Sequence, residues 1–211
     1  MPGRPYDFWL FDLDGTVVDV EESYVHEVIG EVGDRLGRAF TERDAERLWY
    51  ELADDREVVL AAHDVDPAAF WATFHEVDEP AARAEATYVY DDAAAFVPER
   101  TAPVGLVTHC QDYLTGPILD ALDIADWFDT VVCCSDDVGW KPDPRPVELA
   151  MADLGVGGPG HAGVMAGDAP TDLGAARNAG LDGVHVRRGD GAAVDHRGAQ
   201  HHVDVLTDFD T

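Results

Sequence analysis

Two aspartates stand two residues apart at the end of the first strongly apolar stretch of the chain. Residues 7–14 read DFWLFDLD, and Gly15 and Thr16 follow. Alternation along a strand would place Asp12 and Asp14 on one side, where two carboxylates repel each other unless a cation lies between them. Carboxylate oxygens suit Mg²⁺, and a tight turn at Gly15 and Thr16 can direct backbone N–H groups at an anion. The motif predicts a site for Mg²⁺ and an anionic group.

Four more polar residues follow later apolar stretches. Thr108 follows PVGLV, Lys141 lies in GWKPDP, and Asp168 and Asp172 lie in GDAPTD. Lys141 is the only lysine, whereas the chain has 13 arginines. A compact ammonium acts as a point charge where a forked guanidinium would not fit, so this lysine is a candidate for the site. Two structural alternatives stay open, because Asp168 could cap a helix and Asp172 could be an ordinary carboxylate in a first helical turn.

Elements that could position these residues alternate along the chain. Continuous apolar runs predict parallel strands buried on both faces, and helical stretches between the later runs predict crossovers, the last ending at Gly180. We therefore expect an α/β fold with a doubly wound parallel sheet. The expected strands are 7–14, 103–109, 130–135, 162–168 and 182–189, with 202–206 as a short edge strand, and the expected crossover helices are 112–122, 146–154 and 170–179.

A long insertion separates the first two strands. Residues 20–88 are too many for one crossover and show helical periodicity, with a capping-box pattern at Thr41 and Asp44 and a proline, Pro67, suited to a helix start. We expect a helical domain at 19–89, inserted into a core formed by 1–18 and 90–211. An insertion after the first strand would sit above the edge of the sheet where such folds bind ligands.

The composition limits the partners. The formal net charge is −29, from 14 basic and 43 acidic residues, so nucleic acid and anionic membrane surfaces are not expected partners. Molar salt would screen this charge, and we interpret the chain as adapted to a salt-rich cytosol, as in a halophile. Three cysteines, two of them adjacent, predict free thiols. We expect a cytoplasmic protein, as a monomer or a homodimer.

Taken together, DLDGT, Thr108, Lys141-Pro142 and GDAPTD resemble the haloacid dehalogenase-like superfamily. The similarity is to its phosphatase branch with a helical cap after the first strand, in particular to members of the phosphoglycolate phosphatase type. It extends over nearly the whole chain. It implies a Rossmann-like core, a Mg²⁺ cofactor and a small phosphorylated metabolite as the substrate.

The resemblance also implies roles for individual residues. Asp12 would be the nucleophile that becomes an aspartyl phosphate, and Asp14 the acid and base. Asp168 would bind the metal beside Asp12 and the backbone carbonyl of Asp14, with Asp172 as a further metal residue, direct or through water. Thr108 and Lys141 would hold the phosphate, and the remaining substrate-binding candidates are Gly15, Thr16 and His109.

The sequence departs from the family pattern at two positions. His109 stands where relatives more often have a small polar residue, and only Trp140 separates Gly139 from Lys141, where many relatives have one residue more. Three other functions remain open: a phosphosugar mutase on the same core, a haloacid dehalogenase, and a non-catalytic phosphate-binding module. Asp14 argues against the dehalogenase, which needs neither a second aspartate nor Mg²⁺.

Overall fold

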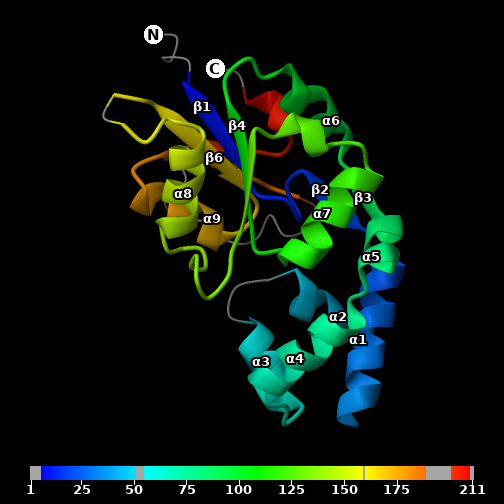
Figure 1. The fold of residues 1–211 in the computed structure, drawn as a ribbon. Helices are drawn as coiled ribbons and strands as arrows, with labels where there is room; N and C mark the ends of the chain where they lie inside the picture. The colour runs from blue at the N-terminus through cyan, green and yellow to red at the C-terminus, as the bar shows by residue number, and fades with distance from the viewer. Residues whose placement is uncertain (1–5, 51–54, 159, 189–200, 210–211) are drawn as a thin grey trace. The chain divides into compact units, whose positions relative to one another are not determined.

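The computed structural model describes residues 6–50, 55–158, 160–188 and 201–209. The chain forms two compact units, which we call the core unit (Met1–Asp19 with Val89–Thr211) and the helical unit (Val20–Tyr88). The two segments that join them, β2 (Val18–Val20) and β3 (Thr87–Val89), pair as a two-stranded sheet. Each unit is described by itself below (Figure 1).

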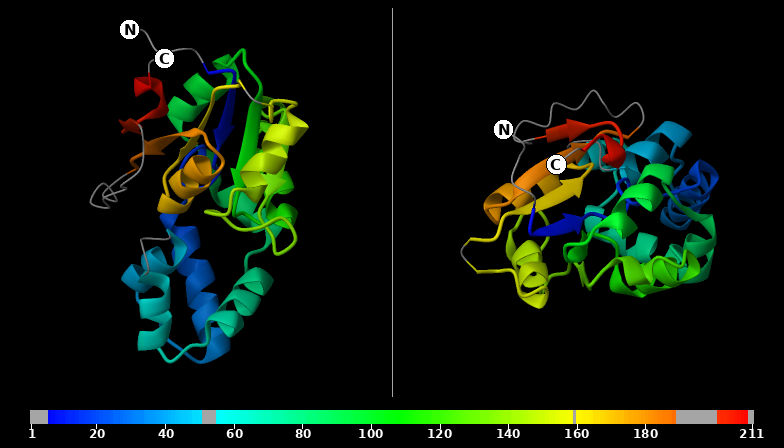
Figure 2. Two further views of the ribbon diagram at one scale, coloured as in Figure 1. Left: turned by 90° about the vertical axis from the view of Figure 1, so that its left-hand side faces the viewer. Right: turned by 90° about the horizontal axis from the view of Figure 1, so that it is seen from above.

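In the part of the core unit that the structure describes, six strands form one sheet with the order β5-β4-β1-β6-β7-β8, and every neighbouring pair is parallel. Figure 2 shows β6, β7 and β8 side by side at one end of this sheet. The central position of β1 lets residues that follow it meet residues that follow β4 and β6. The strands are β1 (Phe8–Phe11), β4 (Val104–Thr108), β5 (Thr130–Cys133), β6 (Gly163–Gly167), β7 (Asp182–Val186) and β8 (His201–Val203).

Successive side chains of β1 point to opposite faces of the sheet, and all of them are apolar. Helices therefore pack on both faces and bury them. Phe8 and Leu10 belong to a buried cluster that also contains residues of the helices α8 (Arg145–Asp153) and α9 (Pro170–Asn178). Trp9 lies on the other side, with its ring centroid 5.3 Å from that of Phe96 in α6 (Asp91–Phe96). Among the described residues, the other helical elements of this unit are α7 (Asp112–Ala121), η1 (Val97–Glu99), η2 (Ala125–Trp127) and η4 (Leu206–Asp208). The predicted doubly wound α/β class is confirmed.

The described residues of the helical unit form five helices around their own apolar core. In α2, the Thr41 hydroxyl accepts a hydrogen bond from the Asp44 backbone N–H and the Asp44 carboxylate accepts one from the Thr41 N–H, so the predicted capping box is confirmed. Pro67 begins α4, as expected. Ile29, Leu48 and Phe70 are fully buried in this core. The helices are α1 (Glu22–Leu36), α2 (Glu42–Trp49), α3 (Asp55–Ala62), α4 (Pro67–Val77) and α5 (Pro80–Ala86).

Several element bounds differ from the sequence prediction. The first strand ends at Phe11 rather than Asp14, because the Leu13 carbonyl accepts hydrogen bonds from the Val17 and Val18 N–H groups and the chain turns there. Strand alternation therefore does not relate Asp12 to Asp14. The expected edge strand at 202–206 is instead β8 at 201–203 followed by η4, and β2, β3 and α6 were not expected. Within the described residues, no helix is long and apolar enough to cross a membrane.

Candidate active site

Four charged side chains from separate segments meet at the carboxyl ends of the central strands. Asp12 follows β1, Asp168 follows β6, Asp172 lies in the first turn of α9, and Lys141 lies in the loop after β5. The Lys141 ammonium is 2.6 Å from Asp12 Oδ1 and 2.6 Å from Asp172 Oδ1, and it donates a hydrogen bond to the Val107 carbonyl of β4 at 3.1 Å. The one lysine of the sequence therefore connects three of the segments that the sheet brings together.

Tight backbone turns hold these carboxylates. The Asp12 N–H continues the sheet pattern by donating to the Ala166 carbonyl of β6, at 2.9 Å. Gly15 has φ +76°, and a Cβ there would lie 2.3 Å from Asp168 Oδ2. A Cβ on Gly167 would lie 2.3 Å from Asp172 Oδ2. Glycine is required at both positions, because the backbone approaches each carboxylate too closely for any side chain.

The site is short of positive charge. Burial raises the pKa of Asp12 to about 8; the ammonium of Lys141 opposes this rise, and the charge of Asp172 adds to it. Burial, together with the charges of Asp12 and Asp172, raises the pKa of Asp168 well above its usual value. Burial alone would lower the pKa of Lys141, but the carboxylates beside it raise that pKa above its ordinary range, so the ammonium stays charged. One ammonium does not balance three carboxylates.

The carboxylates fit a divalent cation. Asp12, Asp168 and Asp172 each offer an oxygen within 4.8 Å of the others. Mg²⁺ binds such oxygens and would offset the unbalanced negative charge. Asp172 has other partners, however, because one oxygen pairs with Lys141 and the other accepts a hydrogen bond from the Ala169 N–H at 3.0 Å. This arrangement favours Asp12 and Asp168 as the direct ligands, with Asp172 holding the lysine.

The other candidate residues lie on the adjoining segments. Thr108 is the last residue of β4, is buried, and accepts a hydrogen bond from the Cys110 N–H on its hydroxyl oxygen, at 2.9 Å. Thr16 is fully buried in the turn after β1. Asp14, in the same turn, is half-buried and forms an isolated β-bridge with Val18. His109 packs edge-on against Trp140, with 5.6 Å between the ring centroids.

Sequence reasoning missed Arg188, which follows β7. Its guanidinium donates hydrogen bonds to the Thr16 carbonyl and to Asp92 Oδ1, both at 2.8 Å, and lies 4.0 Å from the centre of the Tyr90 ring. Its side chain is only 13% exposed. The side chain thus fixes the turn that carries Asp14, Gly15 and Thr16. The sequence signal was a pair of arginines, Arg187 and Arg188, after an apolar strand, which surface arginines would give equally well.

Comparisons with known proteins agree with this geometry. Residues 8–180 match the family model described as haloacid dehalogenase-like hydrolase. The phosphoglycolate phosphatase of Yersinia pseudotuberculosis is 26% identical over 195 residues, 85% of this chain and 80% of that protein. The pyrophosphatase PpaX of Bacillus velezensis is 30% identical over 188 residues, 81% of this chain and 78% of that protein.

Among solved structures, a candidate phosphoglycolate phosphatase from Lactobacillus plantarum shares the fold. It superposes with a TM-score of 0.78 at 19% identity, covering 97% of this chain and 98% of that chain. The family model covers the strands that carry Asp12, Thr108 and Asp168 as well as the loop with Lys141. The chain belongs to the haloacid dehalogenase-like hydrolase family, and the predicted assignment to a hydrolase is confirmed.

Proposed function

We propose that this protein is a Mg²⁺-dependent phosphatase that hydrolyses the phosphate monoester of a small metabolite. The observation that carries the proposal is the position of Lys141, whose ammonium lies 2.6 Å from both Asp12 and Asp172 at the end of the central strands. A buried ammonium beside a carboxylate nucleophile offsets the repulsion between that carboxylate and an anionic phosphate. The relatives named as phosphatases support the same reaction class.

In the first step, a carboxylate oxygen of Asp12 attacks phosphorus while the bond from phosphorus to the ester oxygen breaks. Asp14 donates a proton to that oxygen, so the product leaves as an alcohol and Asp12 carries an acyl phosphate. Lys141 and the Thr108 hydroxyl hold the phosphoryl oxygens in this step. The Gly15 and Thr16 N–H groups, which the sequence suggested for the phosphate, instead donate to the carbonyls of Val18 at 2.8 Å and Leu13 at 3.3 Å, because they close the turn after β1. His109 follows Thr108 at the edge of the site.

In the second step, Asp14 removes a proton from a water molecule, which attacks phosphorus. The bond between phosphorus and the Asp12 oxygen breaks, inorganic phosphate is released, and both aspartates return to their starting states. Asp12 and Asp168 would hold Mg²⁺ with the carbonyl of Asp14, while Asp172 keeps Lys141 in place. When bound, Mg²⁺ supplies positive charge that lessens the repulsion between the carboxylates and the phosphate.

Removing the metal should abolish activity, because the carboxylates then keep an unbalanced negative charge that repels an anionic substrate. The experiment is an assay of phosphate release from a panel of small phosphate esters, including phosphoglycolate, and from pyrophosphate. It is run with Mg²⁺, with EDTA, and with EDTA followed by excess Mg²⁺. We expect release with Mg²⁺, none with EDTA, and recovery after Mg²⁺ is restored. Equal release with and without EDTA would contradict the proposal.

Product analysis in the same assay separates the related mutase reaction from hydrolysis. A phosphosugar mutase would return the phosphoryl group to the sugar as a positional isomer, whereas a phosphatase releases free sugar and phosphate. The assay is run in molar KCl, because we propose that a chain of net charge −29 belongs to a salt-rich cytoplasm. We also propose that the helical unit is the cap and that the protein is a monomer or a homodimer.

Replacing Arg188 with methionine should lower kcat about tenfold or more, with a smaller change in KM, because the turn that carries Asp14 loses a charged hydrogen bond worth roughly 1.5–3 kcal/mol. Initial-rate kinetics of the two parameters checks this. The matched control is Arg187→Met, because Arg187 is the adjacent arginine and pairs with Asp204, whose side chain is 70% exposed. A lower melting temperature with unchanged kcat in Arg188→Met would show that Arg188 only stabilises the fold.

A further inference from the structure

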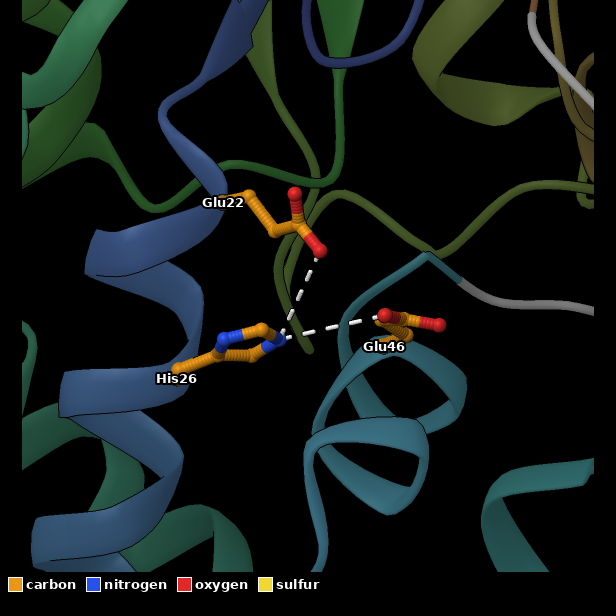
Figure 3. A group of neighbouring side chains, drawn as sticks. All are labelled: Glu22, His26 and Glu46. Atoms are coloured by element: carbon orange, nitrogen blue, oxygen red, sulfur yellow. Dashed lines mark ion pairs between the residues drawn. The ribbon is translucent and has the colours of Figure 1, made fainter.

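A second group of potential ligands lies in the helical unit. Glu22 and His26 stand one turn apart on α1, and Glu46 lies on the neighbouring helix α2. His26 Nε2 is 4.0 Å from Glu22 Oε1 and 3.8 Å from Glu46 Oε1. Figure 3 shows the imidazole between the two carboxylates, with Nε2 directed at both. Two helices thus contribute one nitrogen and two oxygens to one point.

No hydrogen bond within the described residues explains why His26 Nε2 is buried between the two glutamates. Nε2 is buried and has no hydrogen-bond partner among the described residues. Separations of 3.8 and 4.0 Å exceed the range of about 2.7–3.2 Å expected for an N–H···O hydrogen bond. A buried polar atom without a partner is costly, so its position between two carboxylates calls for a further ligand.

The spacing suits a divalent transition-metal ion. The three ligand atoms lie within 4.8 Å of one another. Metal–nitrogen and metal–oxygen bonds of about 2.0–2.2 Å place two ligands of one ion roughly 3–4 Å apart, depending on the angle between them. Small rotations of the two glutamate side chains are enough to bring both oxygens to bonding distance. Glu22 is exposed, which leaves a route for the ion to enter.

The ligand types point to zinc rather than magnesium. Imidazole favours Zn²⁺ and similar ions, whereas Mg²⁺ prefers oxygen ligands only. Two carboxylates and a neutral imidazole carry two negative charges, which one divalent cation balances. We propose that Glu22, His26 and Glu46 bind one Zn²⁺-type ion, with water completing its coordination, and that this ion links α1 to α2. The site uses residues of the helical unit alone, and its nitrogen ligand distinguishes it chemically from the carboxylate group at Asp12.

The test is a Zn²⁺ titration of the tag-free protein in saturating Mg²⁺, followed by calorimetry and by NMR of the histidine ring nitrogens. We expect one Zn²⁺ to shift the Nε2 signal of His26. Binding should disappear in His26→Gln and weaken on the order of tenfold or more in Glu46→Gln. His63→Gln is the matched control, because His63 lies in the same unit but contacts a single carboxylate, that of Asp44, at 3.2 Å; it should bind Zn²⁺ as the wild type does.

Two results would overturn the proposal. One is a Zn²⁺ isotherm for a folded His26→Gln variant that superimposes on that of the wild type. The other is a wild-type His26 ring that stays doubly protonated and unshifted in excess Zn²⁺, which would make the group an ion pair between an imidazolium and two glutamates. The second measurement uses only the wild-type protein, so it decides the question even where a variant fails to fold. Neither result depends on the proposed phosphatase activity.

Discussion

Replacing Asp12 with asparagine is expected to lower kcat on the order of 10³-fold or more while the protein keeps its fold. An amide is not a nucleophile towards phosphorus, so the variant cannot form the acyl phosphate. The fold should persist because Lys141 keeps its contact with Asp172 at 2.6 Å and one of several repelling carboxylates is removed. Steady-state kinetics with circular dichroism of the same sample measures both effects.

Asp14→Asn is the informative comparison for this variant. Asp14 acts on protons rather than on phosphorus, so its loss should reduce kcat far more than substrate affinity. Asp12→Asn should form no acyl phosphate, whereas Asp14→Asn retains the nucleophile. Turnover of p-nitrophenyl phosphate by folded Asp12→Asn at the wild-type rate would show that Asp12 is not the nucleophile.

Replacing Lys141 with methionine is expected to affect both stability and activity. The side chain is 2% exposed and lies between two buried carboxylates, those of Asp12 and Asp172. Removing one partner of a buried ion pair costs about 3–5 kcal/mol, because the remaining charges are left uncompensated. We expect a loss of this size in the free energy of unfolding, measured by denaturant titration in EDTA. Mg²⁺ should restore part of it by supplying positive charge beside the same carboxylates.

Two further variants make the Lys141 result specific. Arg145→Met removes an exposed cation that follows Lys141 in the chain and pairs with Asp143 at 3.0 Å, and it should change stability by less than about 0.5 kcal/mol. Lys141→Arg keeps the charge but places a planar guanidinium where an ammonium makes two contacts of 2.6 Å, so it should not restore activity. A Lys141→Met protein as stable as the wild type in EDTA would contradict the buried ion-pair account.

The sequence predicted the centre of the sheet well because β1, β4 and β6 are buried on both faces. The apolar runs located every strand of the core unit that carries a site residue, since runs such as FWLF have no other favourable environment. Because the carboxyl ends of parallel strands share one edge, the sequence also predicted that Asp12, Asp14, Thr108, Lys141 and Asp168, with Asp172 shortly after, would reach the same edge. The structure brings Asp12, Lys141, Asp168 and Asp172 together there. The catalytic roles of these residues remain predictions.

Contacts between segments that are distant in the chain could not be predicted from the sequence. Arg188 and Thr16 are 172 positions apart, and their hydrogen bond depends on where β7 ends relative to the turn after β1. The pairing of Asp172 with Lys141 depends on the course of the loop after β5. Similarly, the spacing of Glu22 and His26 is visible in the sequence, but the third member, Glu46, depends on how α1 packs against α2. Local patterns carry no information on such packing.

Chemical trapping of Asp12 tests the central claim most directly. Protein mixed with a substrate ester and Mg²⁺ is quenched with borohydride, which reduces an aspartyl phosphate to homoserine but leaves a free carboxylate unchanged. Tandem mass spectrometry of the peptide that contains DLDGT then identifies the modified residue. Our account predicts homoserine at position 12, only when substrate is present. Homoserine at position 14, or none at either position during active turnover, would contradict it.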